Sequence, residues 1–461
     1  MNKHSKSLGE ESISKLLKRL SIPAMMGMMV NALYNFIDTV FLGRFVGTDA
    51  IGALAISFPI QMIIMGLGTM IGIGAASATS RALGAKQIEK ADNIVGNAFF
   101  AIIIIGLFLV TIGRYYLEPI LNLFGASKVL LPLSYDYMNI ILLGSIFLTI
   151  SMVSNNIIRA EGNAKTAMYS MMIGTSFNII MDPIFIKVLG LGIKGAALAT
   201  VLGQLLAFMY VLNYFYRGKS NFKIMPHHLK PNKKYLKEIF TVGFPTFMRQ
   251  IAGSILAIVV NNSLGFYGGD LALSVYGVIN KVLMFILMPM FGIVQGFQPI
   301  ASFNYGAKKF DRIIEVVKIS IKSLIIYSTV GFLIIQIFPS SIIRIFNNDS
   351  ELISLGTKAI RTVTILIPLI GIQIIASSLF QALGKPKPAL IVSMSRQTIF
   401  LIPLVLIIPK INNLGLYGVF IAFPIADFLS IILSSILLKR EMKLLHSLDN
   451  ETKIVINKKI N

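Results

Sequence analysis

The sequence predicts an all-α integral membrane protein, with twelve transmembrane helices in two six-helix lobes. Of its 461 residues, 55% are hydrophobic and only 13% are charged, whereas soluble proteins carry about 25% charged residues. The mean hydropathy of +0.77 points the same way. Long apolar runs follow one another along the chain, and the second half repeats motifs of the first.

Twelve apolar runs reach the roughly 20 residues that a helix needs to cross ~30 Å of hydrocarbon. The second and eighth runs are long enough to tilt or to project beyond the bilayer. The runs expected to span the membrane are 20–42, 51–78, 93–113, 134–158, 166–186, 195–216, 240–263, 271–301, 317–337, 356–381, 389–409 and 416–438.

Basic residues concentrate in the tails and in alternate connections between these runs. The chain has 42 Lys and Arg against 20 Asp and Glu, a net charge of +22. The positive-inside rule therefore predicts a multi-pass protein of the plasma (inner) membrane with both termini in the cytoplasm. We interpret 216–239 as a cytoplasmic linker between a first lobe, 1–215, and a second lobe with its tail, 240–461; a lipid-binding basic arm is the alternative. A nucleic-acid binder would instead gather its charge on one soluble face.

The two halves resemble each other at a constant offset. Because each half holds six spans, both halves face the same way, and a pseudo-twofold axis should follow the membrane normal. Parallel repeats of this kind are typical of secondary transporters that bind their substrate between the halves. The matching segments, 222 residues apart, are LSIPAMM (20–26) with VGFPTFM (242–248), RALGAK (81–86) with FNYGAK (303–308), and RAEGNAK (159–165) with QALGKPK (381–387).

Two acidic residues of the first half lie inside apolar runs. At 1.5 Å per residue, Asp38 is ~27 Å and Asp182 ~24 Å from the cytoplasmic start of its run, so both lie in the outer part of the membrane at one level. Close together, two carboxylates cannot both stay ionised and unpaired, and no Lys or Arg of the first half lies at that depth. A bound Na⁺ or H⁺ at Asp38 and Asp182 is the expected partner.

Further oxygen atoms are expected near this pair. Asn178 is one helical turn before Asp182 and shares its face. Thr200 lies only ~7 Å below the outer surface, and Tyr137, at the outer start of the fourth run, is placed to cap the cluster. Hard oxygen ligands of this kind suit Na⁺.

The motifs resemble those of the multidrug and toxic compound extrusion (MATE) family over residues 12–440. The resemblance rests on the GA-K loops after the second and eighth runs, the RAEGN loop after the fourth, and NIIMDPIF in the fifth. The Y-N-x-x-D pattern of the first run points to the prokaryotic DNA-damage-inducible and MepA-like branches. The resemblance implies a cation site in the first lobe, with an Asn of the fourth run nearby, at Asp38, Asn178, Asp182, Thr200, Tyr137 and, as the best match for that Asn, Asn155.

Each of these assignments has a structural alternative. Asp38 and Asp182 would also serve as hydrogen-bonded staples between helices, Asn178 as interhelical glue, and Thr200 as a partner of its own backbone. Methionines near the predicted lobe interface suit a pocket that accepts many shapes, although they are equally compatible with ordinary apolar filling. The residues expected to line a substrate cavity are Met28, Asn31, Tyr34, Met65, Met284 and Met288.

Taken together, these features predict a Na⁺- or H⁺-coupled antiporter that exports cationic or amphiphilic drugs through an inter-lobe cavity by alternating access. We expect a monomer that contacts membrane lipids and small-molecule drugs, binds no nucleic acid or cofactor, and is not an enzyme, since no phosphate loop or nucleophile motif occurs. A flippase for a lipid or lipid-linked sugar is the alternative, with Arg249 and Arg396 as cationic groups; Asp427 is expected to pair with one of them. A channel is disfavoured by the lack of charge rings or a filter-like loop.

Overall fold

The computed structural model describes residues 3–460, without the side chains of residues 3, 34–40, 42–44, 48 and 455–460. Within this range every regular element is a helix, as predicted. The elements up to the end of the sixth span are α1 (Lys3–Glu10), α2 (Ile13–Phe45), α3 (Thr48–Gly84), α4 (Ile88–Tyr115), α5 (Leu117–Leu123), α6 (Leu130–Ala160), α7 (Ala164–Pro183), the π-helical turn η1 (Ile184–Val188) and α8 (Gly192–Tyr216).

The second half begins after a short connection that contains one 3₁₀ turn. Its elements are η2 (Pro226–Leu229), α9 (Lys233–Gly306), α10 (Phe310–Ile337), α11 (Pro339–Arg344), α12 (Ser350–Val363), α13 (Ile367–Ala382), α14 (Pro386–Met394), the π-helical η3 (Ser395–Leu401), α15 (Ile402–Ile407), the 3₁₀ turn η4 (Ile408–Asn413) and α16 (Gly415–Ile460).

The helices account for twelve spans. Among the described residues, nine helices are long and apolar enough to cross a membrane. One of them, α9, carries two spans, because Gly269 (φ 60°, ψ −156°) breaks its helical path. The helices α12 and α13 form a further span that is bent by 48°, and α2 supplies the first span. The prediction of twelve transmembrane helices is therefore confirmed.

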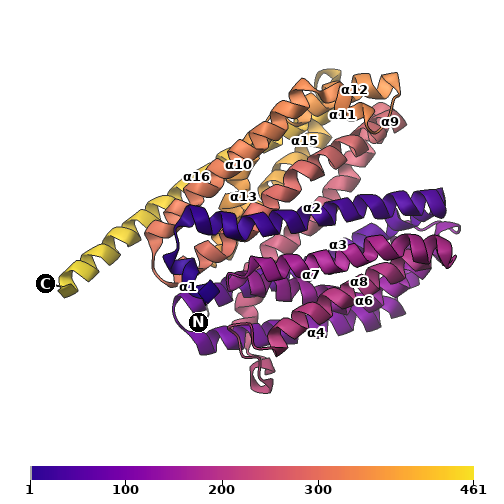
Figure 1. Ribbon diagram of the computed structural model, residues 1–461. Coiled ribbons are helices and arrows are strands. Elements are labelled where there is room, and N and C mark those ends of the chain that lie inside the picture. Colours follow the sequence, from indigo (N-terminus) through magenta and orange to yellow (C-terminus); the bar gives the residue numbers. More distant parts are fainter. Residues whose placement is uncertain (1–2, 461) are drawn as a thin grey trace.

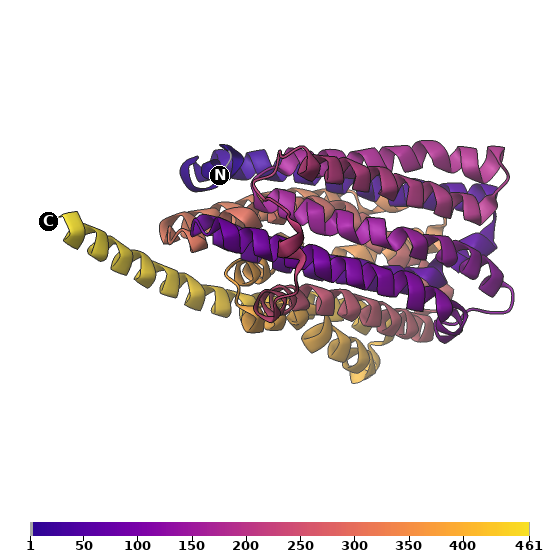
Figure 2. The same cartoon turned by 90° about the horizontal axis from the view of Figure 1, so that it is seen from below.

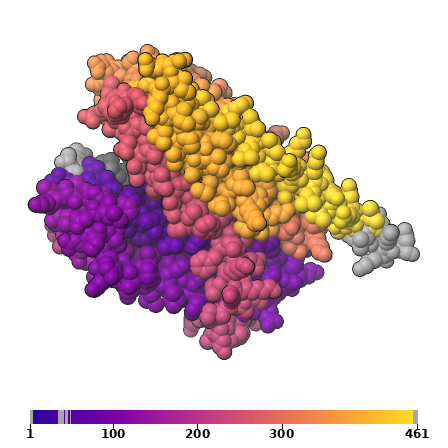
Figure 3. All heavy atoms as spheres, turned by 180° about the vertical axis from the view of Figure 1, so that it is seen from behind, coloured from indigo at the N-terminus to yellow at the C-terminus, as the bar shows by residue number. Residues whose placement is uncertain are grey.

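The spans of each lobe run side by side, the two sets are inclined to each other, and both ends of the described chain lie at the same end of the bundle (Figures 1 and 2). We call this the terminal end, and the opposite end, where α9 turns back at Gly269, the distal end. The last part of α16 continues as a helix beyond the bundle (Figure 2), so the expected tail is helical. The two lobes meet at the terminal end and diverge distally, and the space-filling view shows the surface hollowed between them there (Figure 3).

The hydrophobic core follows the same division. One large cluster joins both halves, and it includes Leu16 of α2, Ile71 of α3 and Phe297 of α9. A separate cluster fills the distal part of the first lobe alone, with Ile64 and Ile193 among its members. The lobes thus share one core at the terminal end and have separate packing distally.

The duplication is visible in the backbone of the loops. Lys86 and Lys308, 222 residues apart, both have left-handed φ angles, of 60° and 56°. The loop amides repeat the same bonding pattern, since Gln87 donates to Ala82 and Lys309 to Asn304. Gly162 (φ 88°) and Gly384 (φ 71°) form a second matched pair. Left-handed backbone at equivalent positions is the signature of one fold used twice.

The two repeated loops touch each other through glycine. A Cβ atom on Gly84 would lie 1.9 Å from the carbonyl oxygen of Phe303, and one on Gly306 would lie 1.9 Å from that of Arg81. Adding 222 to Gly84 gives Gly306, and adding 222 to Arg81 gives Phe303, so the two contacts are equivalent under the repeat. The pseudo-twofold axis therefore passes between them. Any side chain here would force the ends of α3 and α9 apart.

Polar contacts also tie the lobes together at the terminal end. Arg81 of α3 forms an ion pair with Glu238 at the start of α9, with 2.7 Å between Nη2 and Oε1. It also donates to the carbonyl oxygen of Ala382, at 3.1 Å. Opening of the lobes at this end therefore requires these contacts to break.

The N-terminal segment bridges the lobes in the same region. Ser5 of α1 donates to the carbonyl oxygen of Glu161 in the first lobe, at 3.0 Å. The carbonyl oxygens of Leu8 and Gly9 accept hydrogen bonds from the second lobe, from Asn304 (3.0 Å) and Lys309 (2.7 Å). The helix α1 is consequently held by both halves of the duplicated fold.

The break at Gly269 yields a prediction about stability. Its φ and ψ values lie in a region essentially reserved for glycine, so Gly269→Ala should lower the free energy of unfolding by about 1–3 kcal/mol. Outside the adjoining chain, no atom of the described residues lies within 4 Å of the position of the new Cβ, so we expect the loss to come from backbone strain. Thermal unfolding of the purified protein in detergent measures the effect.

Gly277→Ala is the matched control. Gly277 lies on the same helix, has an ordinary helical backbone and likewise has no atom within 4 Å of the new Cβ. This variant should be unchanged or slightly more stable, because alanine favours a helix. Equal unfolding midpoints for the two variants would contradict the assignment of strain to Gly269.

Candidate functional site

A buried polar cluster lies where α7 and α8 pack together. Asp182 of α7 is fully buried, and Asn178, one turn earlier, is 3% exposed. The side-chain amide of Asn178 donates to Oδ1 of Asp182 at 3.3 Å and lies 3.1 Å from Oγ1 of Thr200 on α8. The structure therefore brings together three of the residues that the sequence placed in the cation site.

The local sequence explains why these side chains meet. Asn163 caps α7 by accepting a hydrogen bond from the amide of Thr166 at 3.2 Å. A Cβ atom on Gly203 of α8 would lie 2.6 Å from the carbonyl oxygen of Gly174, so glycine permits the two backbones to approach closely. The close approach places Asn178 beside α8. A Cβ atom built on Gly203 would lie 3.6 Å from the Cβ atom of Asn178.

The cluster still has acceptor capacity. Oδ1 of Asn178 is buried and has no hydrogen-bond partner among the residues that the structure describes. Together with the Asp182 carboxylate and the Thr200 hydroxyl, it makes an all-oxygen donor set of the kind that hard cations prefer.

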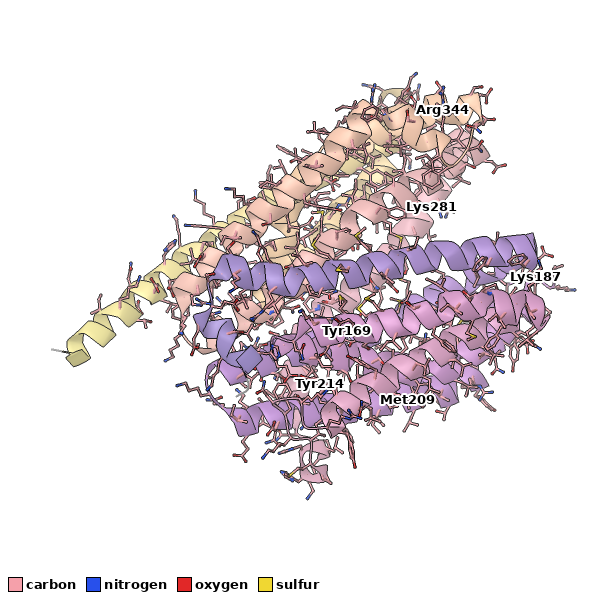
Figure 4. All side chains as sticks on the ribbon, in the orientation of Figure 1. Tyr169, Lys187, Met209, Tyr214, Lys281 and Arg344 are labelled. Atoms are coloured by element: carbon pink, nitrogen blue, oxygen red, sulfur yellow. The ribbon has the colours of Figure 1, made fainter. Side chains whose placement is uncertain are left out.

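Asp38 lies at the same level of the bundle along its helix. It is ~10 Å from the distal end of α2, and Thr200 is ~12 Å from the distal start of α8. The helix α2 packs directly on α7. The side chains of Asp38 and Tyr34 lie outside the described residues, so the pairing of Asp38 with Asp182 stays a prediction. In Figure 4 the labelled Lys187, five residues after Asp182, marks the distal end from which these depths are counted.

The two predicted residues of α6 lie far from each other. Tyr137 is 3% exposed near the distal end, where its hydroxyl accepts a hydrogen bond from Gln61 at 3.4 Å. Asn155 is 18 residues further along the unbroken α6, ~27 Å away, near the terminal end. The structure thus does not bring Asn155 to the Asp182 cluster, and one ion cannot contact both Asn155 and Asp182.

The expected cavity residues lie on helices at the lobe boundary. The helices α2, α3 and the second segment of α9 carry them, and these helices pack on one another across that boundary. Their role in substrate binding stays a prediction. The half-buried members are Met28, Asn31, Met65, Met284 and Met288.

The second lobe neutralises its own buried acid. Asp427 of α16 is 1% exposed, and its Oδ1 accepts a hydrogen bond from Nε of Arg396 at 2.5 Å. This confirms the expected pairing and selects Arg396. Arg249 instead lies over the ring of Phe291, 5.6 Å from its centroid.

Another buried carboxylate, that of Glu161, lies at the terminal end in the loop between α6 and α7. Its oxygens accept hydrogen bonds from the hydroxyl of Tyr214 (2.5 Å), the hydroxyl of Ser220 (3.1 Å) and the backbone amide of Asn221 (2.7 Å). Burial raises the pKa of Glu161 to about 7, against the opposing effect of these hydrogen bonds. The loop between α8 and α9 is fixed to the first lobe through this side chain.

The sequence patterns did not assign a role to several charged residues that the structure places at notable positions. Lys281 is exposed in the second segment of α9 (Figure 4), and Arg159 is buried at the terminal end of α6. The ion pair between Arg81 and Glu238 joins segments 157 residues apart. The signal for Arg159 and Arg81 was present, because both belong to motifs that repeat at the 222-residue offset, but the repeat does not reveal what their side chains contact.

Comparison with known families gives a match in both halves of the chain. The sequence profile of the family described as MatE matches residues 23–184 and 245–407. The chain is 28% identical over 419 residues to the multidrug export protein MepA of Staphylococcus haemolyticus, covering 91% of each chain. It is 27% identical over 417 residues to MepA of Staphylococcus aureus, covering 90% of this chain and 91% of the relative.

Solved structures share the same fold. The MATE multidrug transporter DinF-BH is 43% identical, with a TM-score of 0.90 and coverage of 97% of this chain and 100% of that one. A MATE family transporter of the MOP superfamily in an outward-facing conformation has a TM-score of 0.92 at 25% identity, covering 97% and 99%. A MOP superfamily transporter of Pyrococcus furiosus, described as having a binding pocket of reverse polarity that suggests a different function, has a TM-score of 0.92 at 26% identity, covering 97% and 99%.

Removing Arg396 should be strongly destabilising. Arg396→Gln leaves the carboxylate of Asp427 buried without its partner, which should cost about 3–5 kcal/mol and lower the thermal unfolding midpoint in detergent. Asp427→Asn in the same chain should recover most of that loss, because it removes the isolated charge. Arg249→Gln is the comparison variant and should cost less. A double variant as unstable as Arg396→Gln would contradict the pairing.

The raised pKa of Glu161 predicts a pH dependence of stability. The folded-state pKa of about 7 exceeds the ordinary value of 4.5, so the folded chain binds the proton more tightly than the unfolded chain. The protonated Glu161 side chain therefore adds about 3 kcal/mol to the free energy of unfolding. This stabilisation is fully present below pH 4.5 and is lost as the pH rises through 7. Glu161→Gln should remove this part of the dependence between pH 5 and 8, measured as the difference from wild type in unfolding midpoint. Parallel pH profiles would contradict it.

Proposed function

The chain belongs to the MatE family of multidrug efflux transporters, and on that premise we propose that it is a cation-coupled antiporter. It exports cationic or amphiphilic small molecules across the plasma membrane, with both termini in the cytoplasm. The coupling ion is Na⁺ or H⁺. The observation that carries the proposal is the buried cluster of Asp182, Asn178 and Thr200 in the membrane part of the first lobe.

A carboxylate in a transmembrane helix is costly and marks ion pathways. The Asp182 side chain is fully buried, and the neutral amide of Asn178 donates a hydrogen bond to its Oδ1. Asp38 lies at the same level on the helix that packs against α7. A site with two carboxylates, an amide oxygen and a hydroxyl would take up Na⁺, or would hold a proton with a raised affinity.

The duplicated fold supplies this site once. The position equivalent to Asp38 in the second half is Val260, which is fully buried in apolar surroundings. Two buried acids of the second lobe are already neutralised, Asp427 by Arg396 and Glu441 by Lys385. Ion coupling is therefore assigned to the first lobe, and the second lobe acts as the partner against which it moves.

The arrangement of the lobes supports alternating access. The lobes share a core at the terminal end and are hollowed apart distally (Figure 3), which corresponds to an outward-open state if the termini are cytoplasmic. A similar fold is reported for a MATE family transporter in an outward-facing conformation. A cation bound from outside would favour the state that releases the drug, so that drug and cation weaken each other's binding.

The flippase alternative receives less support. A site for a phosphorylated lipid needs cations that are available to it, but Arg396 is engaged by Asp427 and Arg249 lies on the ring of Phe291. Lys281 is a further cation of the second lobe, and its side chain is exposed. A transporter of Pyrococcus furiosus with a similar fold is described as having a binding pocket of reverse polarity that suggests a different function. A lipid-translocation assay therefore tests the flippase alternative for this chain.

Ethidium efflux from membrane vesicles tests the antiport proposal. Under an imposed Na⁺ or pH gradient, wild type should export ethidium, and Asp38→Asn and Asp182→Asn should each reduce gradient-driven efflux by at least tenfold, because the ion can no longer bind with its charge compensated. Thermal unfolding in detergent shows that the variants are folded.

Asp136→Asn is the matched acidic control. Asp136 lies on α6 near the same distal end but is partly exposed and pairs with Lys194 at 3.2 Å. Its substitution should leave efflux unchanged. Robust gradient-driven efflux in both Asp38→Asn and Asp182→Asn would remove the central claim.

A further inference from the structure

A small polar cavity lies between the lobes at the terminal end, apart from the Asp182 cluster. Its volume is about 10 Å³, room for the centre of one species the size of water. Helices α3 and α6 of the first half form one wall, and the second segment of α9 forms the other. The polar residues that line it include Asn156, Arg159, Gln295, Gln298 and Ser302.

The charge in this cavity comes from Arg159. This side chain is 8% exposed, and its Nη2 donates to Oδ1 of Asn156 at 3.2 Å. No ion pair of Arg159 with a carboxylate occurs among the described residues. A buried guanidinium with one neutral partner is an unfavourable arrangement unless something else compensates its charge.

The opposite wall presents hydrogen-bond donors without partners. Nε2 of Gln298 and Oγ of Ser302 are both buried and unbonded within the described part of the chain. Gln298 is 9% exposed and Ser302 fully buried. Gln295 contributes an unpartnered amide oxygen, and a rotation of that amide by 180° would present its N–H₂ group instead. A positive charge and two uncommitted donors around one small cavity favour a negative occupant.

We propose that this cavity binds a small monatomic anion, chloride, between Arg159 of the first lobe and Gln298 and Ser302 of the second. The anion accepts hydrogen bonds from the guanidinium, the amide and the hydroxyl, and it neutralises the buried charge. A water molecule would satisfy the amide and the hydroxyl but would leave the guanidinium without a counter-ion. Polyatomic anions such as sulfate and phosphate are too large for a cavity of this volume, whereas the monatomic halides chloride and bromide are close in size.

The walls belong to different lobes, so the site exists as a whole only while the terminal end is closed. Chloride would therefore stabilise the distally open state by binding to it selectively. The inference does not depend on cation coupling, because it concerns different residues at the other end of the bundle.

Thermal unfolding of the full chain in detergent tests the site. At constant ionic strength, replacing gluconate by chloride should raise the unfolding midpoint along a saturating curve, by about 2 °C or more. Gln298→Glu places a fixed carboxylate beside Arg159, so its midpoint in gluconate should equal or exceed that of wild type in chloride, and its chloride response should vanish. Ser302→Ala should need a higher chloride concentration for the same rise.

Arg114→Gln is the control, because Arg114 is bonded to Asn139 elsewhere in the first lobe, and its chloride response should match that of wild type. Wild type without a chloride response would overturn the proposal, as would a response that persists unchanged in Gln298→Glu and Ser302→Ala. If a variant does not fold, crystals of wild type in bromide decide: an anomalous peak between Arg159 and Gln298 supports the site, and its absence overturns it.

Discussion

The close contact between the ends of α3 and α9 constrains the rest of the molecule. At Gly84 and Gly306 the backbone of each repeat lies against a carbonyl oxygen of the other, in a space that no side chain fits. Without this contact the repeated loops could not meet, and the ion pair from Arg81 to Glu238 and the bridge formed by α1 would lose their geometry. Because van der Waals packing, rather than the hydrophobic effect, drives helix association in lipid, small residues at such a crossing determine how closely the lobes join.

Three of the buried carboxylates among the described residues illustrate three ways of placing an acid away from water. Asp427 has a guanidinium partner, Glu161 is surrounded by hydroxyl and amide donors near the loops, and Asp182 has a neutral amide beside it. Of these three, the Asp182 carboxylate is the one for which we propose that a mobile cation or proton compensates the charge. The difference between a structural acid and a coupling acid is therefore found in the partner rather than in burial.

Much of the fold follows from periodicity and duplication. The apolar runs located the spans, and the 222-residue offset anticipated the paired left-handed residues Lys86 and Lys308. The approach of Asn178 and Thr200 was foreseeable from helix rise, since both lie at one depth. Helix rise puts Asn155 ~27 Å from Tyr137 along the continuous α6, near the terminal end, whereas the family resemblance implied that both belong to the ion site.

The remaining features depend on contacts between distant segments. Counting residues says how deep Arg159 lies but not that Gln298 faces it across the lobes. Counting also does not predict that Asp427 pairs with Arg396 rather than with Arg249, because both arginines lie within apolar runs. Tertiary pairing of long side chains is decided by the rotation of each helix about its axis, which the hydrophobic pattern of a fully buried helix does not define.

The bridge made by α1 has a consequence for biosynthesis. The carbonyl oxygens of Leu8, Gly9 and Glu11 accept hydrogen bonds from Asn304, Lys309 and Arg312. These carbonyl groups precede their partners by about 300 residues, so they can form their native bonds only after the eighth span and the loop after it have been synthesised. A nascent first lobe without the second therefore has backbone carbonyl groups whose native hydrogen-bond donors are still missing, and the native contacts of this segment depend on synthesis of the second repeat.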